Sequence, residues 1–337
     1  MISTNTTSTP TDRPSFDFAR WWDRYGILFV LIALVLLMAA IAPNFASVDN
    51  FWNIARAISI NAILAAGMTF VIITAGIDLS VGSTVAVAGV VSVMAAMAGV
   101  PALPAVLIGV IAGAFAGLVN GLLAAYMSLA AFIVTLASMT FLRGLGYTLT
   151  GGQPIVDGNL SFRALGSGAV LGIPAPVIAM LIVYIVAWFL LEHTTYGRHV
   201  YAVGGNPEAA RLAGVNVKAV IASVYVIAGA CAGLAGVLFA GRVVSAQPTA
   251  GEGYELDAIA AVVLGGTSLA GGKGRVVGTF IGALILGVLT TGLILMNVPF
   301  FTQLLVKGIV IVIAVSIDSL KQKRITFGRR VGQPRVA

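Results

Sequence analysis

The sequence has few charged residues and almost no cysteine. Charged residues make up 9% of the 337 residues, whereas soluble domains contain about 25%. Hydrophobic residues make up 59%, and the mean hydropathy is +1.04, so a water-soluble fold cannot bury this much apolar surface. The single Cys231 excludes an intramolecular disulfide and a cysteine-based metal site. Composition therefore predicts an integral membrane protein.

Ten segments are apolar over a length that suits a transmembrane helix, which needs about 20 residues. They comprise residues 26–42, 59–75, 81–99, 105–126, 129–145, 174–191, 219–240, 257–270, 276–295 and 302–317. The predicted fold class is therefore an all-α polytopic membrane protein with about ten transmembrane helices. Residues 1–25 lack the features of a signal peptide. They are predicted to form a cytoplasmic tail, with a transmembrane domain over 26–317 and a basic cytoplasmic tail over 318–337.

The distribution of lysine and arginine predicts the orientation, because these residues are retained in cytoplasmic loops. With both termini inside, fourteen of the nineteen basic residues fall in the cytoplasm and four fall outside. Lys307 alone lies within a span, where we expect its chain to reach the lipid headgroups. The net charge of +7 thus reflects topology. The basic residues are scattered over loops, which argues against nucleic-acid binding.

Two short glycine-rich segments resemble each other. Residues 76–82 and 266–272 each follow an outside-to-inside span, so a parallel internal repeat is possible, with a transport site between the repeats. In so glycine-rich a chain the match can also arise by chance. Residues 265–274 do not form a nucleotide-binding P-loop, because Thr267 and Gly274 stand where that motif needs glycine and Ser or Thr.

Glycines also recur every four residues within the spans, which predicts faces where helices pack closely. They are Gly109, Gly113, Gly117 and Gly121 in the fourth span, Gly229 and Gly233 in the seventh, and Gly278 and Gly282 in the ninth.

Polar residues in the two glycine-rich segments and within the spans are candidates for a translocation pathway, because polar groups in a membrane bundle often serve transport. The candidates are Asp78, Ser80, Asn61, Asn120, Thr267 and Ser268. Each has an alternative structural role. Asp78 either lines the pathway or caps the next helix by accepting backbone N–H bonds, and the uncharged residues can instead bond neighbouring helices.

The loop over residues 192–218 carries signals for a short helix over 207–213. Asn206 suits the N-cap, Pro207 the first helical position and Glu208 the positive end of the dipole, and Gly214 suits a left-handed stop. Arg211 adds an exposed charge. A helix of two turns is marginal alone, so it docks either on this protein's own underside or on a partner.

Three stretches resemble one known family, the membrane permeases of ribose-type carbohydrate importers of the ATP-binding cassette class. They are Gly-Ile-Asp-Leu-Ser-Val-Gly-Ser (76–83), Gly-Gly-Asn-Pro-Glu-Ala-Ala-Arg-Leu-Ala-Gly-Val (204–215) and the long block over 246–275, which begins Ala-Gln-Pro-Thr-Ala-Gly-Glu-Gly-Tyr-Glu-Leu-Asp. The resemblance extends over about residues 50–320.

The resemblance implies a permease subunit in the inner membrane of a bacterium, embedded in lipid and paired with a second permease copy. It also implies ATPase subunits that hydrolyse the ATP, here expected at the helix over 207–213. A periplasmic sugar-binding protein is expected to dock on an outer segment over 246–257, where Glu252, Glu255 and Asp257 are expected to be exposed. The chain itself is expected to hold no cofactor or metal and not to be an enzyme.

Two other interpretations stay open. A permease of a related importer for nucleosides or branched-chain amino acids would have a similar scaffold. An ion-coupled secondary transporter would need several intramembrane acids, and Asp78 is the single candidate.

Overall fold

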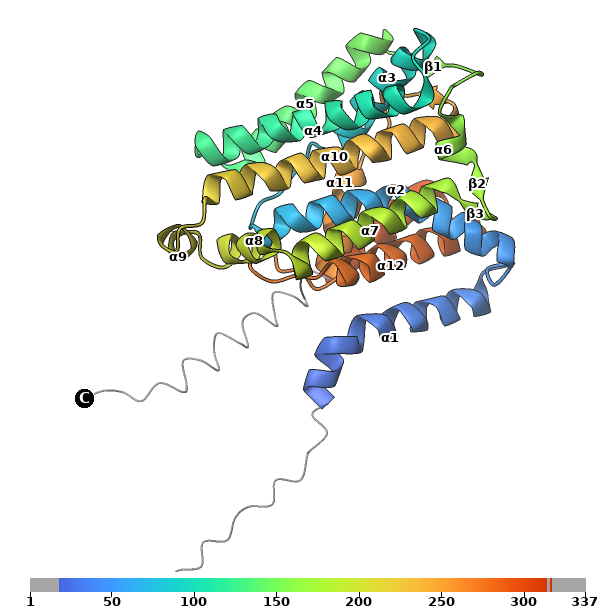
Figure 1. Ribbon diagram of the computed structural model, residues 1–337. Helices are drawn as coiled ribbons and strands as arrows, with labels where there is room; N and C mark the ends of the chain where they lie inside the picture. The colour runs from blue at the N-terminus through green and yellow to red at the C-terminus, as the bar shows by residue number, and fades with distance from the viewer. Residues whose placement is uncertain (1–17, 314–315, 317–337) are drawn as a thin grey trace, which may run out of the picture.

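The computed structural model describes residues 18–313 and residue 316, and Figure 1 shows a bundle of helices lying side by side. The principal helices are α1 (Phe18–Ile41), α2 (Val48–Ile73), α3 (Val81–Met97), α4 (Ala102–Tyr126), α5 (Ala131–Thr150), α7 (Ala175–His193), α10 (Val217–Val243), α11 (Tyr254–Leu264) and α12 (Val276–Leu295). A further apolar helix covers Phe300–Ile313.

Short elements lie at the two ends of the bundle. At one end are α8 (Thr195–Gly205) and α9 (Pro207–Leu212), and we call this the α9 end (Figure 1). At the opposite end, the β1 end, lie α6 (Arg163–Ser167) and four two-residue strands. Strand β1 (Ile155–Val156) pairs antiparallel with β4 (Ser245–Ala246), and β2 (Ala169–Val170) pairs antiparallel with β3 (Ile173–Pro174).

The all-α membrane fold is confirmed by the lengths and apolar character of the helices. Within the described residues, α2, α4, α5, α7, α10 and α12 are each long and apolar enough to span a bilayer. Three shorter apolar helices cover Gly26–Ile41, Val81–Met97 and Phe300–Ile313. These nine helices correspond to nine of the ten predicted spans.

The predicted span over 257–270 is wrong as a continuous helix. Helix α11 has 11 residues, which rise about 16 Å, about half of the 30 Å hydrocarbon core. It ends at Leu264 because Gly265 and Gly266 follow, and Gly266 takes the left-handed φ of +83°.

Other boundaries differ from the prediction. Helix α2 begins at Val48, eleven residues before the predicted span, where the Ser47 side chain accepts a hydrogen bond from the Asn50 backbone. Helix α1 begins at Phe18, inside the predicted N-terminal tail, and residues 1–17 and 318–337 lie outside the described residues. Helix α8 was not predicted; Thr194 caps it.

The predicted glycine faces of the fourth and seventh spans are confirmed by the contact between α4 and α10. A Cβ added to Gly117 would overlap the Tyr225 carbonyl, and one at Gly113 would lie 2.7 Å from the Cα of Gly233. The two backbones therefore touch directly, as small residues in membrane helices allow. Beside them, most of α2 is buried, which places it at the centre of the bundle.

Candidate functional site: two interrupted segments and an exposed helix

Two non-helical segments enter the bundle. Residues 74–80 connect α2 to α3, and residues 247–253 connect β4 to α11. The second segment meets the first turn of α3, directly after the first segment, at Gly82, where an added Cβ would overlap the Gly251 carbonyl and the Glu255 carboxylate. Irregular backbone in a membrane protein is tolerated where it is buried in protein or lines a cavity. The meeting point of these segments is therefore a candidate functional site.

Asp78 is buried in the first segment, with 1% of its surface exposed. Its Oδ1 accepts hydrogen bonds from the Ser80 backbone N at 2.9 Å and the Ser80 hydroxyl at 2.6 Å. Asn120 on α4 donates from Nδ2 to the Ser80 hydroxyl oxygen at 2.8 Å. These bonds form a local turn between Asp78 and Ser80, the N-cap residue of α3, and no side-chain hydrogen bond caps α3 itself among the described residues, so the predicted capping role is not seen. A pathway role for Asp78 stays a prediction.

Asn120 also faces a groove between α4 and α5. The groove has a volume of about 400 Å³, and its lining includes Asn120, Ser138 and Phe141. The buried Oδ1 of Asn120 has no hydrogen-bond partner among the described residues. The groove lining is mostly apolar, and this buried oxygen is an unsatisfied hydrogen-bond acceptor close to it.

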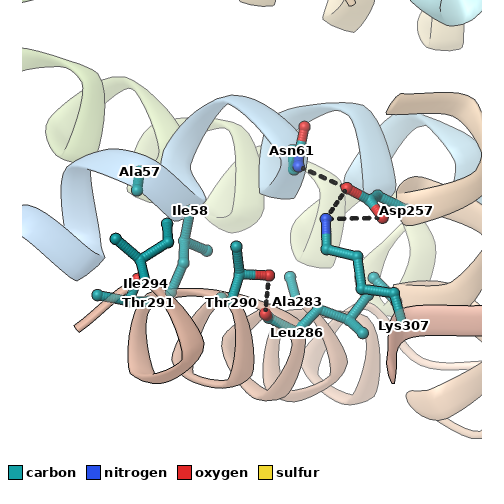
Figure 2. Close-up of a pocket in the computed structure, with 12 residues that line it drawn as sticks. Ala57, Ile58, Asn61, Asp257, Ala283, Leu286, Thr290, Thr291, Ile294 and Lys307 are labelled. Atoms are coloured by element: carbon teal, nitrogen blue, oxygen red, sulfur yellow. Dashed lines mark hydrogen bonds and ion pairs between the residues drawn. The ribbon is translucent and has the colours of Figure 1, made fainter. Parts of the chain in front are cut away.

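A second polar cluster joins α2, α11 and the helix over Phe300–Ile313. Lys307 Nζ lies 3.0 Å from Asp257 Oδ2, and Asn61 Nδ2 donates to the same oxygen at 3.3 Å (Figure 2). The Lys307 and Asp257 side chains are 20% and 16% exposed. These residues line a cavity of about 100 Å³ together with Thr290 and Thr291 of α12. The expectation that Lys307 reaches headgroups was wrong, because its ammonium group pairs with a carboxylate inside the bundle.

Thr267 and Ser268 lie in the turn between α11 and α12. Thr267 is fully buried, and its hydroxyl has no hydrogen-bond partner in the part of the chain that the structure describes. The Ser268 hydroxyl accepts from the Ala270 backbone N at 3.2 Å. The six predicted pathway residues thus fall into three separate groups: Asp78 with Ser80 and Asn120, Asn61 with Asp257, and Thr267 with Ser268.

The acidic residues predicted for docking differ in exposure. Glu252 is exposed and Glu255 is half-buried beside Gly82. Asp257 is paired with Lys307, so the expectation of an exposed carboxylate was wrong for that residue. The reason is that Asp257 lies on α11, where its carboxylate contacts Lys307 and Asn61 inside the bundle.

Arg143 on α5 holds residues 247–253 in place, and it was not predicted as a site residue. Its guanidinium donates to the carbonyl oxygens of Pro248 at 2.6 Å and Ala250 at 2.9 Å. An arginine at the outer end of the predicted span over 129–145 was the signal, because a partly buried guanidinium needs acceptors.

Helix α9 has the predicted caps. Asn206 Oδ1 accepts from the Ala209 backbone N at 3.0 Å, and Gly214 has the left-handed φ of +85°. Arg211 pairs with Glu208 at 2.6 Å. The hydrogen bond from Arg211 holds the pKa of the Glu208 carboxyl below its ordinary value.

Almost all of α9 is exposed. Ala210 is its buried residue, whereas Leu212 is 75% exposed. Ala210 packs against the hydrophobic core of the bundle, while the other residues of α9 are exposed. Docking of α9 on this protein's own underside and docking on a partner therefore both stay predictions.

The described residues contain no group of three or more histidine, cysteine, aspartate or glutamate side chains placed to hold a metal ion.

Comparison with known proteins identifies the family. Residues 50–315 match the model of a family described as the permease component of the branched-chain amino acid transport system. The chain belongs to this family. It is a multi-pass membrane permease, and the family serves transport and not catalysis.

Among its relatives are ribose import permeases. The chain is 48% identical to the one from Escherichia coli over 94% of this chain and 100% of the relative. It is 46% identical to the one from Bacillus subtilis over 92% and 97%. The Escherichia coli L-arabinose transport permease is 39% identical over 96% and 98%. The resemblance to ribose-type permeases is therefore confirmed. No solved structure matches the chain.

Proposed function

We propose that this protein is the transmembrane permease subunit of an ATP-driven importer of ribose-like monosaccharides in the inner membrane of a bacterium. The observation that supports this most strongly is the 48% identity, over 94% of the chain, to a ribose import permease. Partner subunits bind and hydrolyse the ATP, and this chain supplies the route through the membrane.

The α9 end faces the cytoplasm in this proposal, and both termini lie inside. Arg198, Lys218 and Arg275 belong to loops or helices at that end, which agrees with the retention of basic residues inside. The β1 end then faces the periplasm. A sugar-binding protein docks there, and Glu252 is the acidic candidate that is exposed.

The pathway runs beside the α4–α5 groove between this chain and a second permease copy. The groove has a volume of about 400 Å³, which is within the range of roughly 300–1,000 Å³ that is typical of small-molecule sites. Asn120 offers an acceptor for a sugar hydroxyl there, and Ser80 and Asp78 hold Asn120 in place. Thr267, Ser268 and the Asn61 cluster flank the interrupted helices whose movement opens the route.

Helix α9 is the contact with the ATPase. Pro207, Glu208, Arg211 and Leu212 are exposed on this helix, which lies at one end of the bundle (Figure 1), while the Asn206 and Gly214 caps fix the helix ends. A six-residue helix is too short for independent stability, so contact with a partner completes it.

Uptake by cells tests the substrate class. Deletion of the coding sequence should abolish accumulation of labelled ribose, and the wild-type chain should restore it. Labelled leucine and a labelled nucleoside serve as controls, because the family description names branched-chain amino acids. Loss of leucine or nucleoside uptake with unchanged ribose uptake would contradict the sugar assignment and favour the corresponding alternative.

A further inference from the structure

Three segments from distant parts of the sequence meet through their backbones at the α9 end. Gly204 in the last turn of α8 lies against Ile73, the last residue of α2, and against Gly272 in the turn between α11 and α12. A Cβ added to Gly204 would overlap the Ile73 carbonyl and would lie 2.7 Å from the Gly272 backbone N. The same Gly272 N donates a hydrogen bond to the Ile73 carbonyl at 2.8 Å.

Neighbouring residues reinforce this contact. A Cβ on Gly271 would lie 2.8 Å from the Gly204 carbonyl, and Gly271 has a φ of +82°. The Tyr201 hydroxyl of α8 donates to the Gly274 carbonyl at 2.9 Å. Backbone atoms in direct contact have no rotamers through which to absorb a displacement, so close-packed groups of this kind transmit movement.

The covalent connections of the three segments give the contact its importance. Asn206 alone separates the end of α8 from the start of α9. Ile73 leads directly into residues 74–80, which contain Asp78. The turn that holds Gly272 joins the half-length helix α11 to α12. A shift of α9 therefore reaches both residues 74–80 and the turn between α11 and α12 through one point.

We infer that Gly204 is a positioning residue whose contact with Ile73 and Gly272 transmits the movement of α9 to the interrupted helices. The inference rests on the proposed function, in which α9 contacts the ATPase. It adds a specific mechanical link between that contact and the transport route. The requirement at position 204 is for the absence of a side chain, because any Cβ would separate the three backbones.

Adjacent glycines provide a matched pair of variants. A Cβ at Gly205 would meet no atom within 4 Å, and Gly205 has no left-handed φ. Gly205→Ala should therefore behave like the wild type, whereas Gly204→Ala should push α8 away from α2. Both changes add one methyl group at the same helix end, so they affect helix propensity and membrane insertion alike.

The experiment measures coupling in the purified complex of the permease with its ATPase and binding protein. The readout is the number of labelled ribose molecules transported per ATP hydrolysed, together with the amount of ATPase retained. For Gly204→Ala we expect the ratio to fall at least about fivefold, the lower end of typical coupling between sites, with ATPase retention unchanged. A variant that is merely destabilised would lose transport and ATP hydrolysis together and keep the ratio.

Equal ratios for Gly204→Ala and Gly205→Ala would overturn the inference. If Gly204→Ala does not accumulate in the membrane, Tyr201→Phe decides, since it removes one hydrogen bond of the contact without adding atoms. A reduced ratio in that variant supports the link, and a wild-type ratio overturns it. Absence of any ATPase bound to the wild-type chain would instead contradict the proposed function and, with it, this inference.

Discussion

The ammonium group of Lys307 forms an ion pair with the carboxylate of Asp257, at 3.0 Å, inside the helix bundle. Asp257 lies on the half-length helix α11, which is too short to cross a bilayer alone. Lys307 lies on the helix over Phe300–Ile313. The pair therefore anchors the short helix to a neighbour, and each charge compensates the other in a medium of low dielectric constant.

Removing one member of this pair should be worse than removing both. Lys307→Met leaves the Asp257 carboxylate uncompensated and should lower the free energy of unfolding by about 3–5 kcal/mol, as for broken buried ion pairs. Asp257→Asn should do the same to Lys307. The double variant should recover much of the loss. Thermal unfolding in detergent measures all three, and a double variant no more stable than the worse single variant would contradict the anchoring role.

Ser80 and Ser83 offer a matched test of the Asp78 cluster. Ser80→Ala removes a hydrogen bond to Asp78 and the acceptor for Asn120, so it should cost about 1–3 kcal/mol through unsatisfied buried groups. The Ser83 hydroxyl is buried without a partner in the described chain, so Ser83→Ala should be neutral. The same unfolding assay compares them, and equal stability of the two variants would refute the cluster's contribution.

The α4–α10 contact should tolerate no added methyl group. Gly117→Ala places a Cβ against the Tyr225 carbonyl, and overpacking of this kind costs about 1–3 kcal/mol. Gly144→Ala on α5 meets no atom within 4 Å and should leave the midpoint of thermal unfolding unchanged or raise it. A stable Gly117→Ala variant would mean that α10 moves away from α4 without loss.

The exposed leucine of α9 should matter for ATPase binding. Leu212→Asp should insert normally but retain several-fold less ATPase on purification, because it places a charge in an apolar contact. Leu171 at the β1 end is 97% exposed, and Leu171→Asp should retain the wild-type amount. Equal retention in both variants would move the ATPase contact to another loop.

Local signals in the sequence predicted the parts of the structure that depend on neighbouring residues. Asn206 and Gly214 identified the ends of α9, and the four-residue glycine spacing identified the face of α4 that contacts α10. The early end of α11 was also visible in principle, because Gly265 and Gly266 interrupt the apolar run. Glycines are so common in this chain that such an interruption did not stand out.

The contacts between distant residues were not predictable in the same way. Lys307 and Asp257 are 50 positions apart, and their pairing depends on how three helices pack. Arg143 reaches carbonyl groups more than 100 positions away. Hydropathy and charge counts place such residues at a depth in the membrane but do not say which helices are neighbours.

Reconstitution in lipid vesicles tests the proposed transport class most directly. The purified permease, its ATPase and a ribose-loaded binding protein are combined, with ATP supplied on the α9 side. We predict that labelled ribose moves from the β1 side to the α9 side only when all three proteins and hydrolysable ATP are present. Ribose accumulation driven by a proton or sodium gradient without ATP would contradict the proposal and identify a secondary transporter.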